Sequence, residues 1–119
     1  MDNRGVARED LHFELSSLEK GYDDFVHHTG TIQQMSRATE EHIYWEKNTF
    51  EQMREGSPDD KKLQLLLDEH AEHLNALTHS NYDLMQTLSQ EQSKMAQEFE
   101  EAKQDLKTQI LDLEDARGY

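Results

Sequence analysis

The sequence predicts an all-α protein, a long antiparallel two-helix hairpin with a coiled-coil-like seam. Apolar residues recur at alternating spacings of four and three, and the strongest helix-breaking signals are gathered at one point of the 119-residue chain. Hydrophobic residues make up 34% of the chain and charged residues 32%. This composition suits long helices with one narrow buried stripe better than a thick core. We therefore expect a single helical hairpin over residues 1–119.

The first helix is expected over about residues 9–55, because the four-three spacing is the seam of a left-handed helix pair. Four polar residues, Thr29, Ser36, Thr39 and Glu46, occupy positions in this seam. The complete predicted stripe is Leu11, Leu15, Leu18, Tyr22, Phe25, Thr29, Ile32, Ser36, Thr39, Ile43, Glu46, Phe50 and Met53.

The turn is expected where a helix-stop signal directly precedes a helix-start signal. Gly56 suits the left-handed position that follows a helix. Ser57 is a good N-cap and Pro58 a good first helical residue, while Asp59 and Asp60 place negative charge at the N-terminus of the next helix. Since short connections make neighbouring helices antiparallel, these residues predict a helical hairpin.

From this turn at 56–57, the second helix is expected over about residues 58–116. The hairpin gives a crude register in which facing residue numbers sum to about 113, with Ile43 near His70 and Phe50 near Leu63. About 17 residues at the C-terminus would then extend beyond the first helix. The predicted stripe is Leu63, Leu67, His70, Leu74, Leu77, Asn81, Leu84, Leu88, Met95, Phe99, Ala102, Leu106, Ile110 and Leu113.

Apolar residues also lie off this stripe: Val26, Met35, Trp45, Leu65, Leu66, Met85 and Leu111. They either widen the intramolecular stripe or form a second face that docks on other helices, completing a four-helix or larger bundle. Trp and Tyr are enriched at binding hot spots, although Trp45 could equally cap the core of the hairpin itself. The predicted partner-binding residues are Met35, Tyr44, Trp45, Phe50, Met53, Leu66 and Met85.

The histidines allow a metal site to be considered. His70 and His73 share a helix face, and the register brings His42 and Glu46 close to them. A di-iron bundle needs Glu-x-x-His on two helices, however, and Glu9–His12 is the single match in this chain. We expect no metal and no cofactor. The sequence also lacks cysteine, a Gly-rich phosphate loop and a Gly-x-Ser-x-Gly motif, so no catalytic residues are predicted and an enzyme is not expected.

The charge balance restricts the partners. Twelve Lys and Arg against 26 Asp and Glu give a net charge of −14, which argues against nucleic acid. Residues 63–93 contain no Lys or Arg, so this stretch serves either solubility or the steering of a basic helical partner. No apolar run is long enough for a membrane span, and the first ten residues lack the apolar core of a signal peptide. We expect a cytoplasmic protein, or one co-secreted without a cleaved signal peptide.

The layout of the chain resembles that of a known class. Tyr44-Trp45-Glu46, the tip Gly56-Ser57-Pro58 and the acidic end at residues 111–115 resemble the small helical proteins of bacterial type VII secretion. The resemblance is closest to the LXG-associated α-helical proteins, which are larger than the WXG proteins. Trp45 is not followed by the glycine of the WXG turn. No aromatic residue is followed four positions later by Asp or Glu, as in the export signal of that family.

This resemblance implies a function through protein–protein interaction. The chain would be an accessory or targeting factor, similar to a chaperone, that binds the helical N-terminal domain of an LXG toxin. A second small helical protein would carry the export signal. Two alternatives remain open: a structural coiled-coil protein that homodimerises, and a metal-binding helical bundle.

Overall fold

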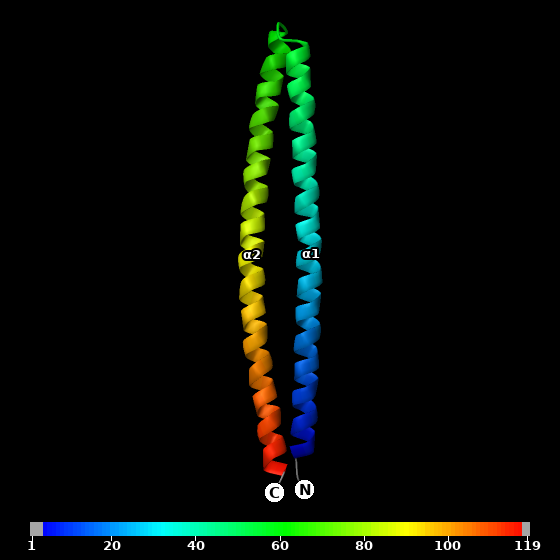
Figure 1. The fold of residues 1–119 in the computed structure, drawn as a ribbon, viewed down its shortest axis with the longest axis vertical. Coiled ribbons are helices and arrows are strands. Elements are labelled where there is room, and N and C mark those ends of the chain that lie inside the picture. Colours follow the sequence, from blue (N-terminus) through cyan, green and yellow to red (C-terminus); the bar gives the residue numbers. More distant parts are fainter. Residues whose placement is uncertain (1–3, 118–119) are drawn as a thin grey trace. The chain divides into compact units, whose positions relative to one another are not determined.

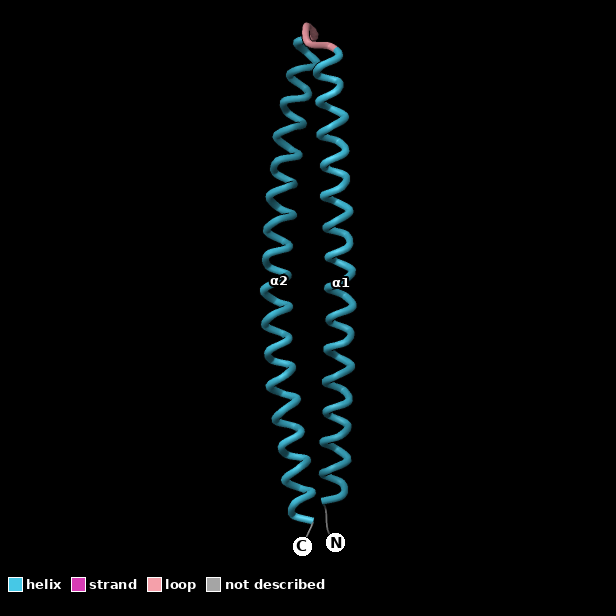
Figure 2. Tube along the Cα trace, viewed as in Figure 1, coloured by secondary structure: helices cyan, strands magenta, loops and turns pink. Residues whose placement is uncertain are grey.

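The computed structural model describes residues 4–117, and they form two α-helices: α1, Arg4–Gly56, and α2, Lys61–Arg117 (Figure 1). A loop of residues 57–60 joins them (Figure 2), and no strand occurs among the described residues. The all-α helical hairpin predicted from the sequence is therefore confirmed. α1 begins five residues earlier than expected. α2 begins three residues later than expected, because the turn lies at 57–60 rather than at 56–57.

Residue contacts divide the chain into two compact units. The terminal unit pairs the part of α1 up to Thr29 with the part of α2 from Gln90 onward. The turn unit comprises Gly30–Ser89 and includes the loop. Each unit contains one antiparallel pair of helical segments and is described separately below.

The loop differs from the predicted turn in its capping residues. The backbone N–H of Asp60 donates to the carbonyl of Ser57 at 3.3 Å, which closes a four-residue turn with Pro58 at its second position, where proline is favoured. Asp60, not Ser57, caps α2, since its Oδ1 accepts from the backbone N–H of Leu63 at 3.0 Å. Gly56 has no positive φ and is the last residue of α1. The left-handed position predicted for Gly56 is therefore wrong.

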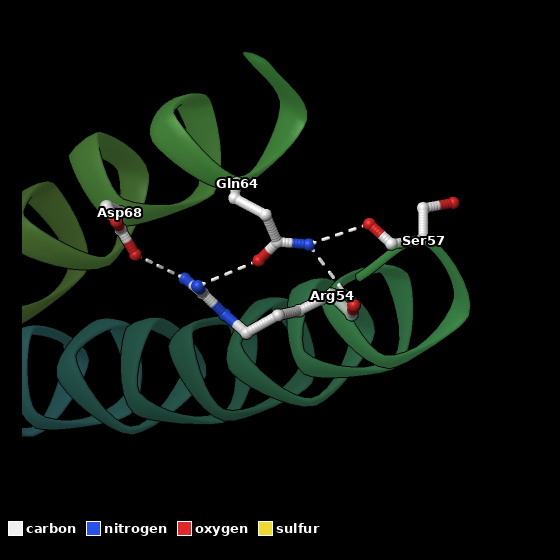
Figure 3. Close-up of polar contacts among 4 residues, drawn as sticks. All are labelled: Arg54, Ser57, Gln64 and Asp68. Carbon is white, nitrogen blue, oxygen red and sulfur yellow. Dashed lines mark hydrogen bonds and ion pairs between the residues drawn. The ribbon is translucent and has the colours of Figure 1, made fainter. Parts of the chain in front are cut away.

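A side chain of α2, instead of a glycine, satisfies the end of α1 (Figure 3). Gln64 Nε2 donates to the carbonyls of Arg54 at 3.2 Å and Ser57 at 2.9 Å. Gln64 Oε1 accepts from Arg54 Nη1 at 3.0 Å, and Arg54 Nη2 donates to Asp68 Oδ1 at 2.6 Å. These contacts supply partners to carbonyls that a helix end leaves without intrahelical donors.

The core of the turn unit follows the predicted stripe. Ile43, Leu67, Leu74 and Leu88 are buried, as are two polar residues of the predicted seam, Ser36 and Asn81. Four other predicted seam residues are exposed: Ile32, Met53, Leu77 and Leu84. The buried surface is thus narrower than the apolar pattern, and it leaves one edge of that pattern open.

The predicted register is wrong by one helical turn in this unit. Asn81 lies opposite Ser36, where the predicted register places Leu77. His70 Nε2 lies 3.2 Å from Glu46 Oε2, and the His70 ring is 4.3 Å from that of Phe50, instead of facing Ile43. The four-residue loop causes this shift, because it moves the start of α2 toward the C-terminus.

The terminal unit is held together by aromatic and aliphatic side chains. The Tyr22 and Phe99 rings stack at 4.2 Å with an interplanar angle of 6°, and Lys103 Nζ lies 5.4 Å from the Phe99 ring centroid. Arg8 Nη2 pairs with Glu114 Oε1 at 2.8 Å. This pair joins the beginning of α1 to the end of α2, so the predicted C-terminal extension is absent within the described residues.

Candidate protein-binding surface

The seam of the turn unit separates two flanks, each formed by both helices. On one flank, which we call the mixed-charge flank, Arg54 contacts Gln64 and Asp68. Two shallow grooves continue along it. The side chains of this flank that line the grooves are Glu40, Tyr44, Lys47, Glu51, Arg54, Ala71, Asn75, Thr78 and Tyr82.

The opposite flank is apolar. Residues three, four or seven positions apart share one face of a helix. This spacing links Ile32 to Met35 on α1 and Leu77 to Leu84 on α2. Trp45 lies at the outer edge of this flank, because it is two positions from the buried Ile43 and so points well away from the seam. The apolar flank consists of Ile32, Met35, Trp45, Met53, Leu66, Leu77 and Leu84, all of which are exposed. Apart from Tyr44, Leu65 and Tyr82, they are all the large exposed hydrophobic side chains of the turn unit.

Two histidines and a carboxylate lie within this apolar flank. Glu46 Oε1 is 2.9 Å from His42 Nε2, while Glu46 Oε2 faces His70 Nε2. The His42 ring in turn lies 6.3 Å from the Trp45 ring. Each imidazole has its own carboxylate oxygen, and no group of three or more His, Asp or Glu side chains among the described residues could hold a metal ion. The arrangement instead forms a hydrogen-bonded bridge from Glu46 of α1 to His70 of α2, with the Trp45 ring beside His42.

Four of the predicted partner-binding residues lie on this flank: Met35, Trp45, Met53 and Leu66. Trp45 is 62% exposed, Met35 65% and Leu66 55%, so none of these three is a core residue. These off-stripe residues do not widen the buried stripe of the hairpin.

The other three predicted residues lie elsewhere. Tyr44 lines a groove of the mixed-charge flank with Asn81 and Tyr82. It does not share a face with its neighbour Trp45, because consecutive helical residues point about 100° apart. Phe50 is half-buried against His70. Met85 is also half-buried. The structure therefore does not bring the seven residues together on one surface.

Sequence reasoning missed three members of the apolar flank, Ile32, Leu77 and Leu84, because it assigned them to the seam. In α2 Met85 is half-buried and its neighbour Leu84 is exposed, and in α1 Gln33 is half-buried and its neighbour Ile32 is exposed. The sequence nevertheless contained a signal for their exposure. Ile32, Leu77 and Leu84 lie at the edge of the apolar stripe, on the side of the stripe where Met35 and Leu66 also lie.

No family model, curated protein or solved structure matches this chain. Among the described residues, neither helix contains a stretch long and apolar enough to cross a membrane.

The two flanks also differ in charge. All basic residues of α1 in the turn unit, Arg37, Lys47 and Arg54, lie on the mixed-charge flank by their position or their groove contacts. On the apolar flank the periodicity places the exposed carboxylates of Glu69 and Asp83 at the outer edge, beside Leu66, Leu77 and Leu84. The apolar flank therefore combines exposed hydrophobic side chains with negative charge.

Proposed function

We propose that this protein is a non-enzymatic accessory factor, similar to a chaperone, for bacterial type VII secretion. In this function it binds the helical N-terminal domain of an LXG toxin through helix–helix association. A second small helical protein with the export signal completes the assembly. The complex forms in the cytoplasm, before export of the toxin.

The observation that carries the proposal is the exposed apolar flank of the turn unit. Both helices expose large hydrophobic side chains on this flank, among them Met35 and Met53 of α1 and Leu66 of α2, with Trp45 at the outer edge. Several exposed hydrophobic side chains on one face are typical of protein–protein contact sites. A helix laid across these side chains would bury them, which is how amphipathic helices bind to grooves.

The identity of the partner is supported by the resemblance of the sequence. The chain places Trp45 before Gly56, the last residue of α1, and before the loop that contains Pro58, a layout that resembles the LXG-associated class. The absence of an aromatic residue followed four positions later by Asp or Glu supports a subunit that depends on a signal carried by another protein.

The proposal is tested by co-expressing the tagged full chain with the products of adjacent genes, including any long protein with an LXG-type helical N-terminus. We expect that domain to co-purify in a defined stoichiometry, measured by light scattering. The matched control is the same toxin without its helical N-terminal domain, which should not co-purify.

Failure of every LXG-type domain to bind would overturn the proposal. If the chain instead formed a homodimer that gained nothing from such a domain, a structural coiled-coil protein would be the better description. The same exposed flank would then be covered by a second copy.

A further inference from the structure

We propose that the apolar flank of the turn unit binds an amphipathic helix whose hydrophobic stripe is bordered by Lys or Arg. This inference rests on the proposed function, which it extends by naming the contact surface and the chemistry of its occupant. It states that the mixed-charge flank is not the main contact surface.

The shape and composition of the flank favour a helix. The exposed side chains of α1 and α2 form two rows on either side of the bridge formed by Glu46 and His70. Met35 and Met53 belong to the first row, with Trp45 at its outer edge. Leu66 and Leu77 belong to the second row. A single helix with apolar residues at three- and four-residue spacing can contact both rows at once.

The charge of the flank favours a basic helix. Glu69 and Asp83 are exposed at its outer edge, and the half-buried Glu46 lies between the rows. From the helical spacing, the only Lys or Arg that the turn unit places on this flank is Lys62, immediately after the loop. Electrostatic complementarity across interfaces selects partners and aids association, so cationic residues beside the stripe of the partner fit this surface.

The same charges disfavour a second copy of this chain as the occupant. In a symmetric dimer the same patch lies on both sides of the contact. Glu69 and Asp83 would then meet a surface with the same negative charge, and each copy carries a net charge of −14. The apolar flank of the second copy offers almost no cation to neutralise them.

The test uses the full chain and two synthetic amphipathic peptides as probes. Both peptides have the same leucine stripe, and they differ only in carrying Lys or Glu beside it. We expect binding of the Lys peptide, measured by fluorescence anisotropy of a labelled peptide, and about tenfold weaker binding of the Glu peptide. Failure of the Lys peptide to bind, or equal affinities for both peptides, would overturn the inference.

Paired charge reversals show whether the position of the charge matters. Glu69→Lys with Asp83→Lys removes the two exposed carboxylates at the outer edge of the apolar flank, and we expect about tenfold weaker binding of the Lys peptide. Glu40→Lys with Glu51→Lys changes the net charge equally on the mixed-charge flank and should cost less than about threefold. Equal losses in the two variants would mean that only overall charge acts, which contradicts the inference.

Paired apolar substitutions locate the contact in the same way. Trp45→Ala with Leu66→Gln should abolish measurable binding of the Lys peptide, whereas Tyr44→Ala with Tyr82→Ala should leave it unchanged. All four residues are exposed, so circular dichroism should show the same helicity in both variants. Loss of binding in the tyrosine variant alone would assign the contact to the mixed-charge flank.

These peptide experiments separate the inference from the proposed function. If an LXG-type domain co-purifies and the apolar-flank variants still bind it, the function stands and the inference fails. If the peptides follow the expected pattern but no LXG-type domain co-purifies, the surface is correctly assigned and the partner is not.

Discussion

Ser36 of α1 and Asn81 of α2 form two hydrogen bonds across the seam of the turn unit, near the end away from the loop. Ser36 Oγ donates to Asn81 Oδ1 at 2.8 Å, and Asn81 Nδ2 donates to the carbonyl of Ser36 at 3.2 Å. Ser36 is 3% exposed and Asn81 7%. A buried polar pair that is satisfied only in one alignment disfavours shifted alignments of two helices.

Removing this pair on one side should destabilise the hairpin. We expect Asn81→Ala to lower the free energy of unfolding by about 1–3 kcal/mol, because it loses both bonds and leaves a buried hydroxyl without its partner. Urea unfolding followed by circular dichroism measures the change. Asn75→Ala is the matched control, since Asn75 is exposed on the same helix and should change the value by less than about 0.5 kcal/mol.

An apolar replacement should separate stability from specificity. Asn81→Leu adds hydrophobic burial to the seam, so the free energy of unfolding should stay near that of the wild type or rise. We expect the loss of the pair to permit other alignments and larger assemblies, seen as heterogeneous masses by light scattering. A homogeneous Asn81→Leu protein of wild-type mass would show that the pair does not specify the register.

The cap of α2 can be tested within the loop. Asp60→Ala removes the acceptor of the Leu63 backbone N–H and should cost about 0.5–2 kcal/mol, measured by thermal unfolding. Asp60→Asn keeps an acceptor oxygen and should retain most of the stability. Asp59→Ala, the adjacent control, should have a much smaller effect. A larger loss from Asp59→Ala would contradict the assignment of Asp60 as the N-cap.

Gln64 offers a test in which charge and hydrogen bonding oppose each other. Gln64→Glu places a carboxylate beside Arg54 but removes the amide that donates to the carbonyls of Arg54 and Ser57. We expect a net loss of about 1 kcal/mol in urea unfolding, since two acceptors lose their donor. Gln34→Glu, at an exposed position of α1, is the control. A more stable Gln64→Glu protein would show that the ion pair outweighs the cap.

The aromatic stack should dominate the stability of the terminal unit. Phe99→Ala removes the ring that stacks on Tyr22 and should lower the free energy of unfolding by about 2–3 kcal/mol, below the value for a fully buried ring because Phe99 is half-buried. Phe13→Ala should have little effect, since Phe13 is 73% exposed in the same unit. Similar losses at both positions would contradict the assigned role of the stack.

The sequence predicted the two helices and most of the seam because these depend on the spacing of apolar residues. This spacing can be read from the sequence of each helix without knowing where the other helix lies. Ile43, Leu67 and Leu74 are buried as expected, and so is Asn81 despite its polarity. Periodicity does not fix how one stripe aligns with the other. That alignment depends on the conformation of the loop, and a small change there moves Asn81 to the position that the predicted register gave Leu77.

The loop itself was predicted less well because two good caps compete within it. Ser57 and Asp60 both favour the N-cap position, and Pro58 suits either the first helical residue or the second residue of a turn. The contacts of Gln64 with Arg54 and Ser57 favour the later start. Such contacts join residues of two helices, so local propensity could not reveal them.

The candidate surface was predicted in part for the same reason. Met35, Trp45 and Leu66 were recognised from the sequence because they lie off the stripe. To predict that Tyr44 lies on the mixed-charge flank, one must know on which side of α1 the other helix packs. To predict that Leu77 is exposed, one must know how wide the buried seam is.

Trp45 is the single tryptophan of the chain, and it lies exposed on the apolar flank beside His42. Indole emission from this protein therefore comes from one point of that surface. Its wavelength changes when the indole loses contact with water, and the nearby imidazole can alter its intensity. The fluorescence of Trp45 can therefore be used to follow binding at this flank in the native chain without an added label.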